Sequence, residues 1–322
     1  MIHRRSFLAT IMVGSLAAPA GARADERLRR VGWLDLGTSA NTLPREVLPA
    51  RLRELGWVEG KSIAFDWLYA DTKPERLSPF VAELLRRKVD VIVTAGTTAI
   101  RAAKDGTTTI PIVMAGGGDP LGAGLVQSLA RPGGNVTGVS LLGQELMEKN
   151  LALLKELLPT LSAVTLIRAA ANPANHFYAK YMDAAASRLG VRLAILDVHG
   201  PDDLEAAFGR ITGNAAFMLL DPMFLAHRRR IAQIAIRRRL PLMTAERRFA
   251  EAGFLLSYGV GMAEVVRLTA VFVDKILRGA KPADLPVEQP TQLDLVVNLA
   301  TAKALGLSIP PAILVQAREV ID

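Results

Sequence analysis

Val89-Asp90-Val91-Ile92-Val93-Thr94, continued by Ala95-Gly96-Thr97-Thr98, is the stretch that decides the fold class of this 322-residue chain. Its first six residues form an apolar run apart from Asp90, which is typical of a parallel strand covered by helices on both faces. We expect a helix to begin near Thr97, directly after that strand. A buried strand followed at once by a helix is the repeating unit of α/β folds with parallel sheets.

Short apolar runs alternate with amphipathic runs on both sides of this stretch. We expect further strands over residues 31–36, 63–69, 110–115, 136–142, 163–167, 191–196, 215–220, 240–243 and 254–258. The intervening helices are expected near 47–55, 77–85, 175–189, 203–211, 227–238 and 262–278. Because the pattern restarts near residue 163, the sequence predicts an α/β protein with two doubly wound α/β lobes joined by a hinge.

Two helix starts carry a capping-box pattern, in which an acid follows a capping residue three positions later. Thr72 with Glu75 forms the first pair, and Asp202 with Glu205 forms the second. We therefore expect side-chain caps at both places. For the lobes we expect residues 25–139 plus 260–286 in lobe 1, and residues 140–259 plus 287–322 in lobe 2.

The first 24 residues have the features of a signal peptide. Arg4-Arg5 precede an apolar run from Leu8 to Ala20, and Ala22-Arg23-Ala24 fits a small-x-small cleavage site. The arginine pair followed by Phe7-Leu8 is similar to a twin-arginine export signal; a general secretory signal with a chance arginine pair is the alternative. Either reading predicts a mature protein that begins near Asp25 and works outside the cytoplasm, in the periplasm.

Composition excludes several kinds of chemistry. The chain has no cysteine, so it has no disulfides, Cys-ligated zinc, iron–sulfur clusters or thiol nucleophiles. No two of its four histidines have metal-ligand spacing, and we find no G-x-S-x-G, Walker A or H-E-x-x-H pattern. The test for a dinucleotide loop fails as well, because Leu121 stands where the last glycine after Gly116 is required. We expect no enzyme, no cofactor and no metal.

The net charge of +8 combines 39 basic with 31 acidic residues, which are interspersed along the chain. This indicates a basic but ordinary surface and no nucleic-acid partner. Arg228-Arg229-Arg230 and Arg237-Arg238-Arg239 bracket one predicted helix. They form either a solvated face or a docking patch for a membrane partner, and the export signal argues against nucleic acid.

Ligands of doubly wound sheets bind outside the carboxyl ends of the strands, so polar residues at those ends are candidates for binding. Thr38 and Ser39 follow the first strand, and Gly96, Thr97 and Thr98 follow the third. A helix N-terminus with threonine hydroxyls suits an anionic group such as an α-carboxylate. The alternative for Thr97 or Thr98 is helix capping.

In the second half, Asp221-Pro222 ends a strand and Asn172-Pro173 follows another. An acid at Asp221 is suited to an ammonium group; the alternative is an Asp-Pro turn. Asn172 is either a turn residue or a ligand amide, and Tyr258 either stacks on a ligand or packs between the lobes. A zwitterion such as an amino acid satisfies the threonine cluster and Asp221 together, with the lobes facing each other.

Several stretches in order along the mature chain carry a family resemblance. They include Arg53-Glu54-Leu55-Gly56-Trp57-Val58-Glu59-Gly60-Lys61, Leu129-Ala130-Arg131-Pro132-Gly133-Gly134-Asn135-Val136-Thr137-Gly138, and Ala283-Asp284-Leu285-Pro286-Val287-Glu288-Gln289-Pro290-Thr291. With them the chain resembles the ABC-transporter substrate-binding proteins of the tryptophan/tyrosine type. The resemblance implies a type I periplasmic-binding fold, capture of a small-molecule ligand between the lobes, delivery to an ABC permease in the inner membrane, and no catalysis.

The resemblance supports ligand roles for Thr97, Asp119, Asn172 and Asp221. Together with the strand-end candidates, the expected ligand-binding residues are Thr38, Ser39, Gly96, Thr97, Thr98, Asp119, Ser140, Asn172, Asp221 and Tyr258. One stretch departs from the family pattern: Arg168-Ala169-Ala170 replaces an aromatic or apolar residue followed by Asn-Pro. Arg168 either adds a cation near the cleft, which favours an acidic ligand, or points to solvent.

Three other functions share the predicted fold. A receptor that presents its ligand to a membrane sensor differs from an importer component only in its partner. A two-lobed isomerase such as a two-cysteine racemase needs thiols, which this chain lacks. A sugar-responsive repressor needs a helix-turn-helix before the first strand, where the mature chain has only Asp25–Arg30. We expect a monomeric periplasmic binding protein.

Overall fold

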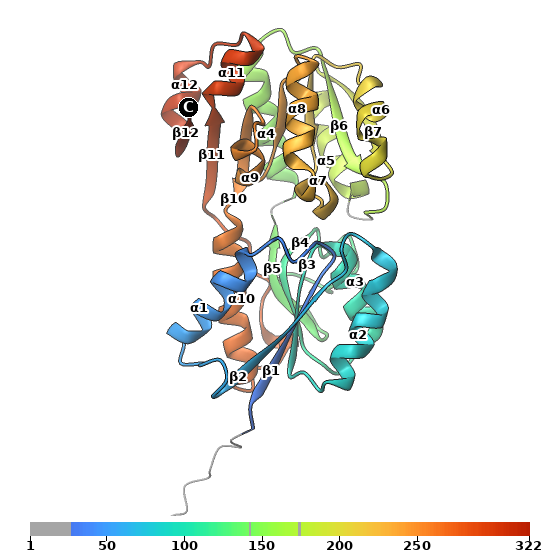
Figure 1. The fold of residues 1–322 in the computed structure, drawn as a ribbon, viewed down its shortest axis with the longest axis vertical. Helices are drawn as coiled ribbons and strands as arrows, with labels where there is room; N and C mark the ends of the chain where they lie inside the picture. Colours follow the sequence, from blue (N-terminus) through green and yellow to red (C-terminus); the bar gives the residue numbers. More distant parts are fainter. Residues whose placement is uncertain (1–26, 142, 173–174) are drawn as a thin grey trace, which may run out of the picture.

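The structure is a computed structural model that describes residues 27–141, 143–172 and 175–322. The predicted signal peptide, residues 1–24, lies outside the described residues. The described chain forms two α/β lobes, one above the other in Figure 1, each built around its own sheet. The predicted fold class, two doubly wound α/β lobes, is confirmed.

The first sheet has the strand order β2-β1-β3-β4-β5, and all its strands are parallel. Its strands are β1 (Arg29–Asp35), β2 (Ile63–Tyr69), β3 (Val91–Ala95), β4 (Ile112–Gly118) and β5 (Val136–Leu141). Along β3, Val91 and Val93 pack with one core while Ile92 packs with the other. Both faces are therefore buried, which is why this segment is almost uniformly apolar.

Four helices cover the two faces of this sheet. Leu48 and Leu52 of the first helix share a core with Val265 and Phe272 of a helix from much later in the chain. The opposite face is covered by two helices that follow β2 and β3 directly (Figure 1). In chain order the four are α1 (Leu43–Glu54), α2 (Leu77–Arg86), α3 (Thr97–Gly106) and α10 (Met262–Leu277).

The second sheet has the order β12-β11-β10-β9-β8-β6-β7, parallel except where β10 meets β11. Its strands are β6 (Ala163–Ala169), β7 (Arg192–Val198), β8 (Ala215–Met218), β9 (Leu242–Thr244), β10 (Leu256–Val260), β11 (Leu293–Asn298) and β12 (Glu319–Ile321). Its helices are α4 (Gln144–Leu157), α5 (Asn175–Arg188), α6 (Leu204–Gly209), α7 (Pro222–Ala226), α8 (Arg228–Arg237), α9 (Arg247–Glu251), α11 (Leu299–Leu305) and α12 (Pro311–Gln316).

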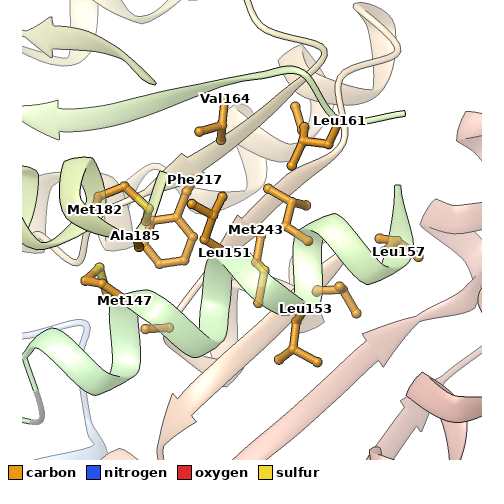
Figure 2. Close-up of a cluster of buried hydrophobic side chains, with 14 of the residues drawn as sticks. Met147, Leu151, Leu153, Leu157, Leu161, Val164, Met182, Ala185, Phe217 and Met243 are labelled. Carbon is orange, nitrogen blue, oxygen red and sulfur yellow. The ribbon is translucent and has the colours of Figure 1, made fainter. Parts of the chain in front are cut away.

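The core of the second lobe combines aliphatic and methionine side chains with several buried phenylalanines. Figure 2 shows Met147 and Leu151 of α4 facing Phe217 of β8 and Met182 of α5. All four are at most 2% exposed. Burying side chains of this size stabilises the fold by about 1.5–3 kcal/mol each, so a chain with few aromatic residues still builds large cores in both lobes.

The chain passes between the lobes in three places: between β5 and α4, between β10 and α10, and between α10 and β11. The last crossing runs beside β5, where Ser140 donates its backbone N–H to the Glu288 carbonyl (2.9 Å) and Glu288 donates to the Gly138 carbonyl (3.0 Å). Helix α10 packs on the first sheet, while β11 and β12 join the second. The residue boundaries of the lobes stay a prediction.

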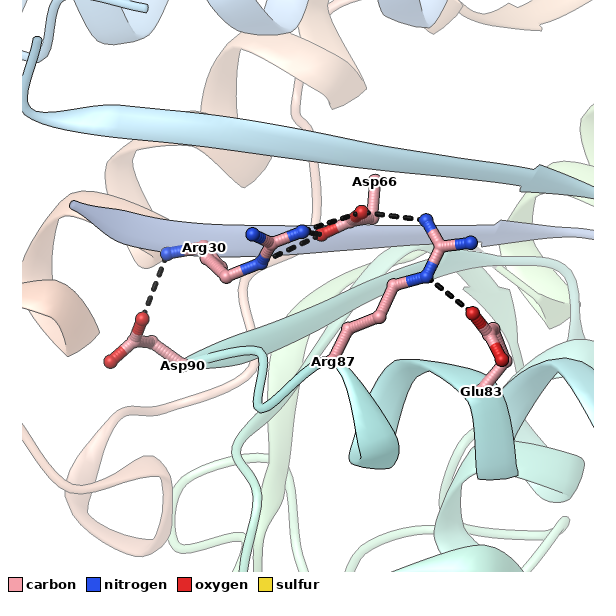
Figure 3. A network of polar contacts seen from close by, with 5 residues as sticks. All are labelled: Arg30, Asp66, Glu83, Arg87 and Asp90. Carbon is pink, nitrogen blue, oxygen red and sulfur yellow. Dashed lines mark hydrogen bonds and ion pairs between the residues drawn. The ribbon is translucent and has the colours of Figure 1, made fainter. Parts of the chain in front are cut away.

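A network of ion pairs closes the end of the first sheet where its parallel strands begin (Figure 3). Asp66 of β2 accepts two hydrogen bonds from Arg30 Nη2 (2.8 and 2.9 Å) and one from Arg87 Nη1 (2.8 Å). Arg87 also donates from Nε to Glu83 of α2 (2.6 Å). The Asp66 carboxylate is only 6% exposed, so two arginines compensate for its burial.

Two expected helix caps are wrong. Helix α2 begins at Leu77, behind a short 3-10 helix, and Thr72 has φ 59° in a turn before it. In the second case a 3-10 helix precedes α6, and Asp203, not Asp202, uses its carboxylate, accepting the His199 N–H at 3.2 Å. In both places an extra turn of 3-10 helix takes the position in which a cap would act.

The fourth strand, expected over residues 110–115, extends through the glycines that follow it. Gly116 and Gly118 lie inside β4, with a register shift against β5 between Ala115 and Gly117. Gly116 has φ 91°, a conformation that costs glycine nothing. A Cβ at Gly118 would lie 2.6 Å from the hydroxyl oxygen of Tyr178 in the other lobe, so this glycine allows the two lobes to approach closely.

Candidate ligand-binding cleft

A cavity of about 540 Å³ lies between the lobes, at the carboxyl ends of strands from both sheets. This size is in the range of small-molecule sites, which often form at interfaces between domains. Its polar and charged lining residues are Asp35, Thr38, Asn41, Thr42, Glu46, Thr97, Asn172, Asn175, Asp221, Arg228, Glu246 and Arg248.

Asp35 is the last residue of β1 and faces the cavity from lobe 1. The residue is 5% exposed. Its carboxylate accepts the backbone N–H of Gly37 at 2.7 Å and the indole N–H of Trp33 at 3.4 Å. Burial raises the pKa of Asp35 above its usual value, more than these donors and the more distant Arg248 lower it.

Asp221 occupies the matching position in lobe 2, after β8 and before α7. It caps that helix, accepting the Met223 N–H at 2.9 Å, and its second oxygen accepts the Asn172 amide at 3.1 Å. The turn alternative is confirmed, because this carboxylate caps α7. The same carboxylate lines the cavity, so the binding role of Asp221 stays a prediction. Burial also raises the pKa of Asp221.

A polar bridge between the lobes runs along the cavity wall. Glu246 caps α9 and accepts Arg248 Nε at 2.9 Å, while Arg248 Nη1 donates to Asn41 Oδ1 of lobe 1 at 2.7 Å. The second carboxylate oxygen of Glu246 is buried and accepts no hydrogen bond from the described residues. Arg248 is thus occupied by two partners and is not a free cation for an anionic ligand.

The N-terminus of α3 opens onto the cavity through Gly96 and Thr97. The Thr97 hydroxyl lies 3.2 Å from both the backbone O and the backbone N of Gly118. It is not a helix cap, because Gly96 holds the cap position with φ 79°. The backbone N–H groups of the first turn remain the donors that a carboxylate would meet here.

The rest of the wall is apolar. Phe217, Leu219 and Phe249 are buried residues of lobe 2 that line the cavity, and Met262 lines it from α10. Tyr178 of α5 adds an aromatic edge. A cavity with polar groups at two lobe faces and an apolar wall suits a small amphiphilic molecule.

Half of the predicted ligand-binding residues line the cavity, and half do not. The five that line it are Thr38, Gly96, Thr97, Asn172 and Asp221. The five that lie outside its lining are Ser39, Thr98, Asp119, Ser140 and Tyr258.

Local contacts or positions explain why these residues lie outside the cavity lining. Ser39 is exposed, and the chain turns back through the Asn41 N–H, which donates to the Thr38 carbonyl (3.1 Å). Thr98 follows Thr97 on α3, and successive helix residues point to different sides. Ser140 is buried and donates to the Leu141 carbonyl (3.1 Å). Tyr258 packs against the lobe 2 core.

Asp119 contacts the other lobe instead of the cavity. Its carboxylate accepts the Tyr181 hydroxyl at 2.7 Å and the Gly122 N–H at 2.9 Å. Burial, followed by the Asp119 hydrogen bond, raises the pKa of Tyr181 to about 12. This pair is a second polar bridge between the lobes, distinct from the one through Arg248.

Arg168 does not line the cavity. Its guanidinium donates to both carboxylate oxygens of Asp197 on the neighbouring strand β7, at 2.6 and 3.1 Å. Of the two alternatives for Arg168, the cation near the cleft has no support from this geometry, because the guanidinium is engaged within lobe 2.

Sequence reasoning missed Asp35, Glu246 and Arg248. Asp35 ends the first strand, and Glu246 follows β9 closely, so the rule that sites lie at strand carboxyl ends could have found both. No comparable signal marks Arg248, because its contact with Asn41 joins residues 207 positions apart.

Comparison with known proteins agrees with this geometry. The profile of the family described as ABC transporter substrate binding protein matches residues 44–321. The chain belongs to this family of substrate-binding proteins.

Relatives of known name are distant in sequence. A tyrosine-binding protein of Clostridioides difficile (strain R20291) is 23% identical over 258 residues, which are 80% of this chain and 74% of that protein. A crystal structure of a conserved domain protein from Vibrio cholerae is 27% identical, with a TM-score of 0.87 over 91% of this chain and all of that one. An ABC domain from Streptococcus pneumoniae in complex with L-Trp is 23% identical, with a TM-score of 0.85 over 92% of this chain and all of that one.

Among the described residues, no helix has the length and apolar character needed to cross a membrane. The same residues contain no group of three or more His, Cys, Asp or Glu side chains that could hold a metal ion.

Proposed function

We propose that this protein is the periplasmic solute-binding component of an ABC importer, and that it captures an amino acid or a related small carboxylate and delivers it to the permease. The observation that carries the proposal is one cavity between two lobes that combines three features. These are a helix N-terminus on lobe 1, a buried carboxylate on lobe 2 and an apolar wall beside them.

Each part of an amino acid has a matching part of the cavity. The first turn of α3 at Gly96 and Thr97 would receive the α-carboxylate. Asp221 would receive the ammonium through charge-assisted hydrogen bonds, with Asn172 holding its carboxylate in place. Phe217 and Phe249 would pack against the side chain.

The relatives support an aromatic amino acid as the first ligand to test, since one is named a tyrosine-binding protein and another was crystallised with L-Trp. The cavity volume of about 540 Å³ and its buried phenylalanines suit a side chain of that kind. The role is binding and not catalysis, and the protein works as a monomer.

Ligand binding is tested on the mature chain from Asp25 by thermal unfolding against single compounds. The panel contains L-tryptophan, L-tyrosine, other amino acids, indole-3-propionate, tryptamine and small dicarboxylates. A compound present at 100 times its Kd stabilises the folded state by about 2.7 kcal/mol, which is a shift of several degrees. No shift with any amino acid or carboxylate would overturn the proposed ligand class.

Delivery and location need their own measurements. Loss of uptake of the identified ligand in cells lacking the protein, restored by the full chain, would support the importer role. Full growth with normal uptake but a lost ligand response would favour the sensor receptor instead. Replacing Arg4-Arg5 by Lys-Lys should block export if the twin-arginine route is used.

A further inference from the structure

Two buried carboxylates face the cavity from opposite lobes, and both are held only by neutral donors in the bonds that they make. Asp35 accepts from the Gly37 N–H and the Trp33 indole. Asp221 accepts from the Met223 N–H and the Asn172 amide. They are 5% and 8% exposed. A buried carboxylate is costly unless a cation compensates it.

The charged side chains around the cavity do not supply that cation by contact. The arginines in the lining are Arg228 and Arg248. Arg248 donates to Glu246 and Asn41, and Arg228 donates to the Leu225 carbonyl at 2.9 Å. The lining thus holds more acidic than basic side chains, the acidic ones being Asp35, Glu46, Asp221 and Glu246.

The segments that carry Asp35 and Asp221 meet across the cleft. An ideal Cβ placed on Gly37 would lie 3.1 Å from Asp35 Oδ1 and 3.6 Å from Cβ of Pro222, the residue after Asp221. The Asp35 carboxylate and the start of α7 therefore both lie within contact distance of the same point beside Gly37. An ammonium group has three donors and can bond two carboxylates at once.

We infer that Asp35 and Asp221 form one cation subsite shared by the two lobes, which takes the primary ammonium group of the ligand. This inference rests on the proposed function, because it refines the amine position of the same cavity and adds Asp35 to it. An amine held from both sides joins lobe 1 to lobe 2, so it contributes to closure as well as to affinity. A ligand without the amine occupies the cavity but leaves both carboxylates uncompensated.

The test is calorimetric titration of L-tryptophan, tryptamine and indole-3-propionate into the wild type, Asp35→Asn and Asp221→Asn. Each substitution removes the charge and keeps one acceptor oxygen. We expect each to weaken L-tryptophan binding by at least about 30-fold, the effect of removing one partner of a buried charge pair. Binding of indole-3-propionate should be unchanged or tighter, because the repulsive charge is gone.

Matched controls are Asp105→Asn on α3 and Asp183→Asn on α5, which make the same change of charge at exposed positions of the two lobes. They should bind within twofold of the wild type. Circular dichroism checks folding, and Asp35→Ser serves as a second variant if Asp35→Asn fails to fold. Small-angle scattering should show that L-tryptophan closes the wild type but not Asp35→Asn.

The outcomes separate this inference from the proposed function. If Asp35→Asn binds L-tryptophan like the wild type while Asp221→Asn loses affinity, the shared subsite is wrong and the amine belongs to lobe 2 alone. If no amino acid binds the wild type, the proposed ligand class fails. Titration with tryptamine then tests the cation subsite by itself. Binding of tryptamine that needs both carboxylates supports the subsite, and no amine binding overturns it.

Discussion

The buried carboxylates at the two ends of strand β1 differ in whether a cation from the chain contacts them. At its start, Arg30 pairs with Asp66, whose carboxylate also bonds Arg87 (Figure 3). At its end, Asp35 faces the cavity with neutral donors only. Only one end of this strand carries a charge pair completed within the chain, and the other end presents a carboxylate that a ligand cation would complete.

This difference indicates that charged residues at the starts of the parallel strands contribute to stability, whereas those at the carboxyl ends are available for binding. Groups at the strand starts lie away from the cleft and have matched partners. At the carboxyl ends, Asp35 and Asp221 contact neutral donors and no cation, which costs folding free energy that a ligand cation would offset. Substitutions at the two ends should therefore have opposite effects on the free energy of unfolding and on affinity.

The largest effect on stability should come from Asp66→Ala, which leaves Arg30 and Arg87 facing each other without their shared carboxylate. Breaking a buried ion pair costs about 3–5 kcal/mol, and we expect the lower end because both arginines are partly exposed. Urea unfolding measures the loss, and ligand affinity at a temperature where the variant is folded should not change. A variant as stable as the wild type would contradict the comparison.

The pH dependence of unfolding should reveal the cost of the buried carboxylates Asp35 and Asp221 at the carboxyl ends of the strands. Burial raises the pKa values of Asp35 and Asp221 above 3.8 in the folded state. The folded protein therefore holds these protons more tightly, so their stabilising contribution is complete below the unfolded pKa and is lost as pH rises through the folded values. Without ligand, the doubly substituted D35N/D221N protein should gain stability relative to the wild type as pH rises from about 4 to 7.

Urea unfolding at several pH values measures that gain. The exposed-site double variant D105N/D183N should track the wild type across the same range. A stability difference between D35N/D221N and the wild type that does not change with pH would mean that the two carboxylates titrate alike in the folded and unfolded chains.

A smaller effect is expected at the bridge between Asp119 and Tyr181. Tyr181→Phe removes a hydrogen bond to a carboxylate, which contributes about 1.5 kcal/mol. Because the bond joins the lobes, the variant should be more open in small-angle scattering without ligand and bind several-fold more weakly. Tyr258→Phe is the control, since Tyr258 lies outside the cavity lining and its hydroxyl makes no hydrogen bond to the described residues. Equal effects of the two variants would argue against a bridge.

The smallest effect is expected at Arg168. Its bond to Asp197 joins partly exposed side chains within lobe 2, and such pairs contribute about 0–1 kcal/mol. Arg168→Ala should therefore change stability by no more than about 1 kcal/mol and leave affinity for every ligand unchanged. A marked loss of affinity for dicarboxylates alone would show that Arg168 faces the ligand after all.

The sequence by itself determined the two-lobed α/β class, because buried parallel strands need uniformly apolar segments followed by helices. It also located the cleft at the strand ends, which is why Thr38, Gly96, Thr97, Asn172 and Asp221 were found. Only the tertiary structure decided which residues meet across the cleft. Arg248 with Asn41, Asp119 with Tyr181, and Gly37 beside Pro222 all depend on how one lobe is placed against the other, and no local pattern of residues encodes that placement.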